Sequence, residues 1–389
     1  MRLAIVASHP IQYQTPLFRE LAGRFDVKVF FAYRATPRDQ AAAGYGVEFE
    51  WDNDLLSGYP FTFVENKSFR PGLKHFFGCD TPSVAAELAQ YRPDAVLVLG
   101  WNLKSYWQAI WAGKRARIPV LVRGDSQLQT PRTAIKRAVK SFIYPVGLRV
   151  FDAALYVGTH SRRYWEHYGY PRQRLFASPH CMDNQWFASR ATPDARAALR
   201  ATYSIPASAK VVLFAGRVVA LKRIFDLLAA AELLKKRGIN LTIMLAGSGP
   251  LENEIAAAAA AIGTRLVQLG FCNQSQMPGA YAAADVLALP SDSETWGLVV
   301  NEAIASGTPV VVSDACGCSP DLADGTAGLT YPTGNVESLA AAINQLLKFP
   351  PSAAELASVA ARHSVRAAAD GVEAAMKACL SRGKKNLPA

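Results

Sequence analysis

Short apolar runs alternate with helix-forming stretches along this chain, and the alternation occurs twice. In the first half, helical patterns at 83–90 and 105–114 lie between apolar runs at 3–7, 27–32, 95–99, 120–122 and 153–157. In the second half, the apolar runs fall at 211–214, 241–245, 266–269, 286–289 and 310–312. Strand and helix in alternation build a parallel sheet with helices on both faces. The sequence therefore predicts an α/β protein with one such sheet in each half.

The length of the chain indicates how these sheets are organised. At 389 residues it is long for a single hydrophobic core, which favours two domains. Pro193-Asp194 and Ile205-Pro206 interrupt the pattern between residues 186 and 208. We therefore predict an N-terminal domain over residues 1–190 and a C-terminal domain over residues 191–365. Two such domains in tandem leave a cleft at the carboxyl ends of their strands, where open α/β sheets bind ligands.

Composition excludes several classes of protein. The apolar run at 3–7 is too short for a signal peptide, and no stretch reaches the roughly 18 uncharged apolar residues that span a bilayer. The cysteines show no C-x-x-C pair and no histidine at metal-ligand spacing, so neither a zinc site nor a disulfide scaffold is expected. These features favour a cytoplasmic protein.

The net charge of +11 is distributed unevenly. Residues 101–150 hold ten Lys or Arg and one acid, whereas residues 251–350 hold two bases and ten acids. A basic patch of this kind implies an anionic partner, and the candidates are a phospholipid surface, a diphosphate-linked acceptor and nucleic acid. Nucleic acid is not expected, because no recognisable nucleic-acid module accompanies the patch.

Residues 131–143 lie inside this patch and mix apolar and basic side chains at near-helical spacing. A helix that lies on a membrane surface has this composition. A core helix with a solvated basic face has it too, and is the commoner cause. An anionic membrane surface therefore stays a candidate partner.

Two carboxylates, Glu294 and Glu302, stand eight residues apart after a predicted strand. Residues i and i+8 lie on roughly the same face of a helix, so one acid could meet sugar hydroxyls and the other a ribose diol. The four residues from Thr295 to Leu298 would open the helix, and the free N–H groups of a helix start attract anions. Two acids beside an anion site suit a nucleoside diphosphate sugar.

This block closely resembles the E-x7-E region of retaining family-4 glycosyltransferases of the GT-B fold. Residues 215–228 resemble the G-R…K-G segment of that family, and residues 245–252 resemble its next strand and turn. Gly270-Phe271, residues 281–285 and residues 307–310 follow in the expected order. The agreement is dense over residues 211–333 and thinner before them.

The resemblance implies two Rossmann-like domains that face each other across a cleft. The first would bind the acceptor, the second the nucleotide sugar, and residues 366–389 would form a helix that crosses back to the first. The implied enzyme is a retaining transferase of hexosyltransferase type. Its acceptor would be a glycan, a lipid-linked molecule or a small molecule, with a role in cell-surface polysaccharide or glycolipid assembly at the inner face of the membrane.

Donor binding is carried over residue by residue. In the family, the basic pair Arg217 and Lys222 would neutralise the diphosphate, Glu294 would contact the sugar and Glu302 the ribose; a solvated basic loop is the alternative for the pair. The predicted donor-binding set is Gly216, Arg217, Lys222, Phe271, Glu294, Thr295, Trp296, Gly297, Leu298 and Glu302. Two departures from the family pattern are Arg223, where a glycine is usual, and Trp296, where a phenylalanine is usual.

The first domain contributes two more candidates for catalysis, besides Arg217, Lys222 and Glu294. His9 follows the first strand, where many family members have a glycine-rich loop, and Asp125 stands near the place of a family histidine that contacts the reacting sugar. Both residues are also ordinary at strand ends and in loops. Gly247-Ser248-Gly249 fails as a dinucleotide fingerprint, because Glu252 holds the third glycine position.

The resemblance implies no cofactor and no required divalent metal. Asp52-Asn53-Asp54 has the letters of a D-x-D metal element, but it lies in a loop of the predicted acceptor domain. Two rival functions stay open. One is a GT-B epimerase or hydrolase of sugar nucleotides, and the other is a non-catalytic protein that binds an anionic surface through its basic patch.

Overall fold

The computed structural model describes residues 1–41, 47–130 and 132–385. The chain divides into two compact units. Unit 1 comprises Met1–Thr36, Asp54–Cys181 and Val365–Ala389, and unit 2 comprises Pro37–Asn53 and Met182–Ser364. The division falls before residue 190, and the segment from Pro37 to Asn53 groups with unit 2 although it lies far away in sequence. The predicted α/β class, with one parallel sheet in each half, is confirmed.

The sheet of unit 1 has the strand order β3-β2-β1-β4-β5-β6-β7, and neighbouring strands pair in parallel. Its strands are β1 (Arg2–Ala7), β2 (Asp26–Phe31), β3 (Phe61–Phe63), β4 (Ala95–Val98), β5 (Val120–Gly124), β6 (Ala153–Tyr156) and β7 (Leu175–Ala177). The predicted strands correspond to β1, β2, β4, β5 and β6. The prediction missed β3 and β7, which are short strands at the two edges of the sheet and carry little apolar pattern.

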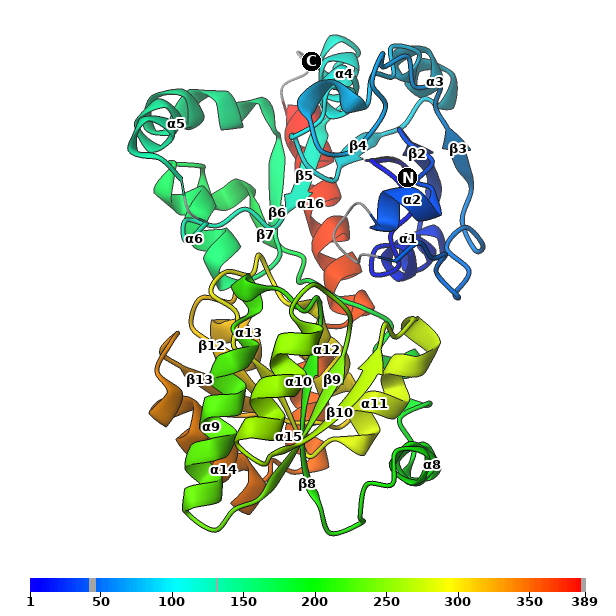
Figure 1. Ribbon diagram of the computed structural model, residues 1–389. Coiled ribbons are helices and arrows are strands. Elements are labelled where there is room, and N and C mark those ends of the chain that lie inside the picture. Colours follow the sequence, from blue (N-terminus) through cyan, green and yellow to red (C-terminus); the bar gives the residue numbers. More distant parts are fainter. Residues whose placement is uncertain (42–46, 131, 386–389) are drawn as a thin grey trace. The chain divides into compact units, whose positions relative to one another are not determined.

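Helices cover both faces of this sheet (Figure 1). They are α1 (Thr15–Ala22), α3 (Val84–Tyr91), α4 (Lys104–Arg115), α5 (Ala134–Gly147), α6 (Thr159–His167) and α16 (Val365–Lys385), with short 3-10 turns at Phe76–Gly78, Leu148–Val150 and Arg172–Arg174. The last helix, α16, packs against α1, β6 and β7 and buries Ala368, Ala369 and Val372 in the core of unit 1. An ion pair of 2.6 Å joins Arg24 to Asp370 of α16.

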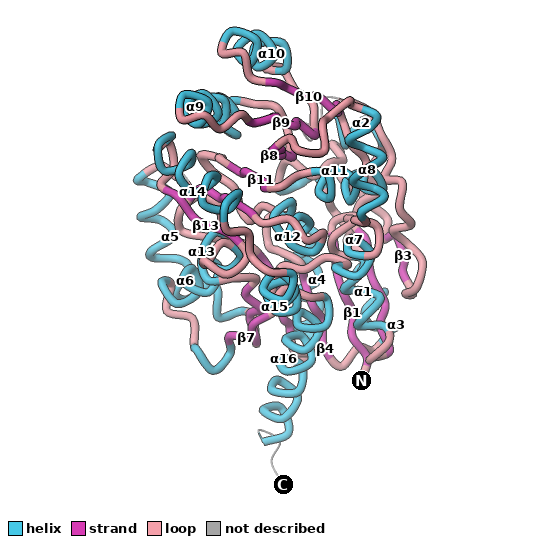
Figure 2. The backbone as a smooth tube through the Cα atoms, turned by 90° about the horizontal axis from the view of Figure 1, so that it is seen from below, coloured by secondary structure: helices cyan, strands magenta, loops and turns pink. Residues whose placement is uncertain are grey.

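The sheet of unit 2 has the strand order β10-β9-β8-β11-β12-β13 and is also parallel. Its strands are β8 (Lys210–Ala215), β9 (Leu241–Ala246), β10 (Arg265–Gly270), β11 (Val286–Leu289), β12 (Val310–Ser313) and β13 (Gly328–Tyr331). Figure 2 shows β10, β9, β8, β11 and β13 following one another across unit 2. The predicted strands correspond to all of these except β13, an edge strand.

The helices of unit 2 surround this sheet. They are α2 (Pro37–Gln40), α7 (Asn184–Ala188), α8 (Pro193–Thr202), α9 (Ile224–Lys236), α10 (Glu252–Ala261), α11 (Met277–Ala283), α12 (Leu298–Ala305), α13 (Ser319–Leu322), α14 (Val336–Lys348) and α15 (Ala353–Arg362), with 3-10 turns at Ala220–Lys222 and Gln274–Gln276. The helices α9 and α14 pack on each other over buried strand residues such as Phe214 and Leu245.

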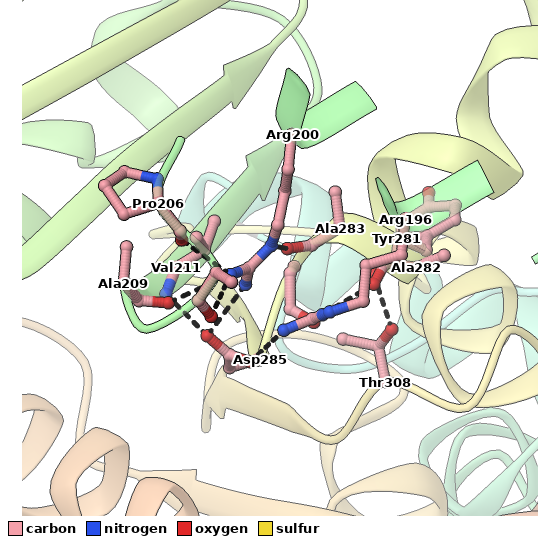
Figure 3. Close-up of polar contacts among 12 residues, drawn as sticks. Arg196, Arg200, Pro206, Ala209, Val211, Tyr281, Ala282, Ala283, Asp285 and Thr308 are labelled. Carbon is pink, nitrogen blue, oxygen red and sulfur yellow. Dashed lines mark hydrogen bonds and ion pairs between the residues drawn. The ribbon is translucent and has the colours of Figure 1, made fainter. Parts of the chain in front are cut away.

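A polar cluster fastens α8 to the end of α11 and to two strands (Figure 3). Arg200, 5% exposed, donates to the carbonyl of Ala283 at 3.0 Å and pairs with Asp285 at 3.2 Å. Arg196 pairs with the same carboxylate at 2.7 Å. Asp285 also accepts the backbone N–H of Val211, at the start of β8, at 2.7 Å. The two guanidinium groups thus satisfy carbonyls at the C-terminus of α11 that the helix itself leaves open.

We expect Arg200→Met to lower the free energy of unfolding by about 3 to 5 kcal/mol. The substitution removes one partner of a buried ion pair and leaves several backbone carbonyls without their hydrogen-bond donor. Arg196→Met should cost only about 1 kcal/mol, because a third of its side chain is exposed. Urea unfolding followed by tryptophan fluorescence measures both. Equal costs for the two variants would contradict the central role of Arg200.

Candidate functional site

Two loops of unit 2 are joined by an ion pair between Lys222 and Glu294. Lys222 ends the 3-10 turn between β8 and α9, and Glu294 follows β11. The lysine is 8% exposed, and the side chain of Glu294 is 24% exposed. Two of the predicted site residues are therefore in direct contact, although 72 positions separate them in the chain.

The next residue, Arg223, has the left-handed conformation, with φ +48°. This conformation costs a non-glycine residue roughly 1 to 2 kcal/mol, which explains why glycine is usual at this position of the family. In this chain, Arg223 pairs with Asp226 at 2.7 Å and with Asp292 at 3.1 Å. The departure from the family pattern therefore leaves the backbone turn in place and adds a second tie between the two loops.

Gly247 and Gly249 bring the turn after β9 against the loop that carries Arg217. A Cβ on Gly247 would lie 1.9 Å from the carbonyl oxygen of Gly216, and one on Gly249 would lie 2.4 Å from that of Val218. Backbone hydrogen bonds of 2.9 Å run from Gly216 N to Ala246 O and from Val218 N to Ser248 O. These glycines serve close packing between two backbones, in agreement with their rejection as a cofactor loop. Arg217 itself is half-buried and forms no ion pair with the described residues.

Gly297 starts α12 with φ +100°, and a Cβ at this position would lie 2.9 Å from Cδ2 of Leu289. The helix was predicted to open over Thr295 to Leu298; it begins at Leu298, the last of these residues, so Thr295 and Trp296 precede it. The expectation that Glu294 and Glu302 share one helical face is wrong. Glu294 precedes the helix and forms a parallel β-bridge with Cys316, because the turn at Gly297 separates it from α12.

The residues at this helix start differ in exposure. Thr295 is exposed and Leu298 half-buried. The indole of Trp296 is in the core: the residue is 4% exposed, its Nε1 donates to Asn301 Oδ1 at 2.7 Å, and its ring lies 5.8 Å from that of His363. The aromatic ring at this position therefore packs within unit 2.

Glu302, on α12, accepts a hydrogen bond of 2.6 Å from the hydroxyl of Tyr281 on α11. Burial raises the pKa of Glu302 to about 7, and the hydrogen bond from Tyr281 lowers it in part. Tyr281 is the first residue of the stretch 281–285 that resembles the family, but the sequence predicted no role for it. A tyrosine near the end of a helix gives no sequence signal of such a contact, because the partner is 21 residues away on another helix.

The ring of Phe271 packs against that of Phe49 in a tilted arrangement, with centroids 4.4 Å apart, and the Phe49 ring in turn contacts that of Trp51 at 4.9 Å. The segment that carries Phe49 is held by two polar ties. Asn273 donates to the carbonyl of Glu50 at 2.8 Å, and the hydroxyl of Ser275 donates to Asp52. Sequence reasoning missed Phe49, because residues 37–53 were placed in the first domain.

Unit 1 holds His9 and Asp125, after β1 and β5 respectively. His9 Nδ1 lies 2.9 Å from Ser8 Oγ. Asp125 lies 4.0 Å from Nε2 of His180, a buried residue that sequence reasoning missed, and the ring of Tyr13 lies edge-on to that imidazole at 5.7 Å.

The segment that carries His180 is held by a buried arginine. Arg123, in β5, donates to Ser178 Oγ at 3.0 Å and to the carbonyl of Pro179 at 2.7 Å. Arg123 therefore ties β5 to the segment that carries His180.

The cysteines are free thiols, and burial raises the pKa values of Cys316 and Cys318. Within the part of the chain that the structure describes, no group of three or more His, Cys, Asp and Glu could hold a metal ion. Asp52 is bound to Ser275, and Asp54 accepts the backbone N–H of Leu56 at 2.9 Å. Both carboxylates of the sequence Asp52-Asn53-Asp54 therefore have hydrogen-bond partners within the protein.

The raised pKa of Glu302 makes a prediction about stability. Between pH 4.5 and about 7 the folded state holds a proton on Glu302 that the unfolded state releases, so its stabilising contribution is full below pH 4.5 and is lost as pH rises towards 7. Glu302→Gln cannot ionise. The variant should therefore gain stability relative to the native chain as pH rises through this window, as measured by urea unfolding.

Tyr281→Phe provides the second arm of this experiment. It removes the hydrogen bond that favours the ionised carboxylate, so the loss of stability should extend to higher pH. If the difference between Glu302→Gln and the native chain is the same at pH 5 and pH 7, the proton is not on Glu302.

Comparison with known proteins shows which proteins this chain is similar to. Residues 195–363 match the model of the family described as glycosyl transferases group 1. The D-inositol 3-phosphate glycosyltransferase of Mycobacteroides abscessus is 38% identical over 161 residues, which cover 40% of this chain and 36% of that protein. The alpha-D-kanosaminyltransferase of Streptomyces kanamyceticus is 28% identical over 207 residues, 51% of this chain and 53% of that protein. The chain thus spans only about a third to a half of the length of these relatives.

Solved structures are similar over nearly the whole chain. Alr3699/HepE of Anabaena in complex with UDP has a TM-score of 0.71 at 17% identity, covering 97% of this chain and 100% of that chain. Sucrose-phosphate synthase of Thermosynechococcus elongatus has a TM-score of 0.64 at 19% identity, covering 99% and 98%. These likenesses show the fold, which is that of the GT-B glycosyltransferases, as predicted.

Proposed function

We propose that this chain, whose residues 195–363 match the model of the glycosyl transferases group 1 family, moves a sugar from a nucleoside diphosphate sugar to an acceptor. The observation that carries the proposal is the contact between Lys222 and Glu294, which sets a buried cation and a carboxylate side by side at the start of α12. The proposed enzyme is a transferase of hexosyltransferase type that retains the configuration at the anomeric carbon.

The diphosphate would bind between Arg217, Lys222 and the N-terminus of α12. A guanidinium without an ion-pair partner can fork onto phosphate oxygens, and the first N–H groups of a helix favour an anion. Lys222 would be shared between Glu294 and the phosphate. Because negative charge grows on the diphosphate as the sugar leaves, these groups would stabilise the transition state more than the bound donor.

The sugar and the nucleoside would meet the remaining residues of the site. Glu294 would accept hydroxyl groups of the transferred sugar, and Glu302 those of the ribose. The contacting rings of Phe271 and Phe49 would offer an apolar surface beside the proposed nucleoside position. Trp296 would contribute through its backbone, because its indole is buried.

The acceptor would bind unit 1, near His9 and Asp125. The pair formed by Asp125 and His180 places a carboxylate beside an imidazole, a combination that can accept a hydroxyl proton or orient a sugar. The proposed acceptor is a glycan, a lipid-linked molecule or a small molecule in cell-surface polysaccharide or glycolipid assembly, on the cytoplasmic side of the membrane. We also propose that no cofactor and no divalent metal takes part, so EDTA should leave turnover unchanged.

The structure of HepE from Anabaena was determined with UDP and with UDP-glucose, which supports a nucleotide-sugar donor in a protein of this fold. The first experiment is therefore a thermal-shift screen of nucleotide sugars, because a ligand that binds the folded state raises its melting temperature. A transferase should then yield a glycoside of unchanged anomeric configuration by NMR. Free nucleotide and free sugar alone would favour a hydrolase, and an isomerised donor would favour an epimerase.

We expect Lys222→Ala to lower kcat by roughly 100-fold or more at saturating donor, with a smaller change in donor affinity, because electrostatic groups of this kind act mainly in the transition state. Lys236→Ala removes an exposed lysine of α9 and is the control. Circular dichroism should show that both variants are folded. An unchanged kcat in Lys222→Ala would mean that this loop is only a basic surface and takes no part in the reaction.

The raised pKa of Glu302 leads to a prediction of how donor binding depends on pH. A ribose diol donates its hydrogen bonds best to an ionised carboxylate, so affinity should rise as pH increases through about 7, the pKa of Glu302. A nucleotide sugar is a suitable ligand, because its diphosphate diester does not titrate in this range. Glu302→Gln should bind roughly tenfold more weakly, for the loss of a charged acceptor, and should show no such rise. Native affinity in this variant, measured by calorimetry, would reject the ribose role.

A further inference from the structure

The helix α5 of unit 1 exposes an apolar face that nothing in its own unit covers. Within this helix no residue is buried. Phe142 is 85% exposed, Ile135 77% and Val146 76%, and more than half of Ile143 and Val139 is exposed. An isolated exposed apolar residue needs no explanation, but a contiguous set on one element marks a binding surface.

The positions of these side chains place them together. Counted from Ile135, the apolar residues fall at i, i+4, i+7, i+8 and i+11, which is one face of an α-helix. Lys136 and Lys140 lie along one border of that face. On another side of the helix, Tyr144 packs against Tyr168, the residue that follows α6, at 5.1 Å and anchors α5 to unit 1. Figure 1 shows α5 beside α6 at the margin of unit 1.

The charge around this face has one sign. No acidic residue occurs between residues 126 and 151, a stretch that holds Arg132, Lys136, Arg137, Lys140 and Arg149. A groove of about 630 Å³ runs along the helix and combines both kinds of side chain; it is lined by Arg132, Thr133, Ile135, Lys136, Val139, Lys140 and Tyr144. The partner of this surface must therefore be apolar and negatively charged at once.

We propose that α5 lies in the interface of an anionic lipid bilayer, with Phe142 and its neighbours among the acyl chains and Lys136 and Lys140 at the phosphate headgroups. A bilayer offers an apolar layer directly beside a layer of negative charge, which is the complement of this helix. The apolar face carries no polar side chain that would set a register against a protein, and a bilayer needs none. Among the described residues no helix is long and apolar enough to cross a membrane, so α5 attaches the protein from one side.

The surface is separate from the donor site of unit 2, and the inference does not depend on glycosyl transfer. It deepens the proposed function in one respect, because it would hold unit 1 at the surface from which a lipid-linked acceptor is presented.

Flotation of the full chain with lipid vesicles tests the proposal. The vesicles contain phosphatidylcholine alone, or phosphatidylcholine with a quarter of phosphatidylglycerol. The native chain should float with the anionic vesicles at low salt, should stay behind with the neutral ones, and should be released at 0.5 M NaCl, where charges are screened over only a few ångströms.

Two variants separate the contributions of charge and apolar face. In Lys136→Gln, Lys140→Gln the partition coefficient should fall by roughly 25-fold, because each cation near an anionic surface contributes a factor of about five. In Phe142→Ser, Ile143→Ser, which keeps every charge, it should fall by roughly tenfold or more. The matched control removes two lysines from α9: Lys235→Gln, Lys236→Gln. All these side chains except that of Lys140 are exposed, so the variants should fold.

The outcomes are distinguishable. Loss of flotation in both α5 variants, with the control unchanged, supports the proposal. Equal loss in the control would assign attachment to net charge, and unchanged flotation in the Phe142, Ile143 variant would assign it to electrostatics without insertion; either result overturns the inference. Failure of the native chain to float would mean that another partner, such as an acidic protein, covers α5. Donor binding measured without vesicles should be the same in all variants, so failure here leaves the proposed function standing.

Discussion

The ion pair between Lys222 and Glu294 is the contact on which the arrangement of the candidate site depends. It is largely buried, so the loss of either partner would leave an uncompensated charge at a cost of about 3 to 5 kcal/mol. Around it, Arg223 ties Asp226 and Asp292 into the same pair of loops. The left-handed turn at Arg223, unfavourable in itself, is thus offset by the ion pairs that it makes possible. The candidate site is thus held together by ion pairs among its own side chains.

A second line of contacts runs from the edge of unit 2 to Glu302. Arg200 and Arg196 cap the end of α11, and this helix carries Tyr281, whose hydroxyl binds Glu302. A cluster far from the proposed chemistry therefore orients a carboxylate that the proposed ribose would meet. Burial raises the pKa of Glu302 to about 7, so its charge state changes near neutral pH. Position and protonation of this residue both depend on the packing of α11 against α12.

Local patterns in the sequence predicted most of the strands, because uninterrupted apolar runs such as those of β1, β8 and β11 are distinctive. The edge strands β3, β7 and β13 were not predicted, because three or four residues at the margin of a sheet carry little apolar pattern. The sequence predicted that Thr295 to Leu298 open a helix, but the backbone turns at Gly297, so Glu294 forms a bridge with Cys316 and does not lie on α12. The prediction that Glu294 and Glu302 share a helical face failed because it treated this segment as one continuous helix.

The sequence by itself determined the α/β class, the order of the motifs between residues 211 and 333, and the mixed basic and apolar character of residues 131–143, because each depends on neighbours in the chain. Only the tertiary structure decided which distant residues meet. It brought Phe49 onto Phe271, His180 beside Asp125 and Tyr281 onto Glu302, and it buried the indole of Trp296 while leaving the apolar face of α5 exposed. The physical reason is that burial and long-range contacts are properties of packed elements, and the same side chain is core or surface according to what its element packs against.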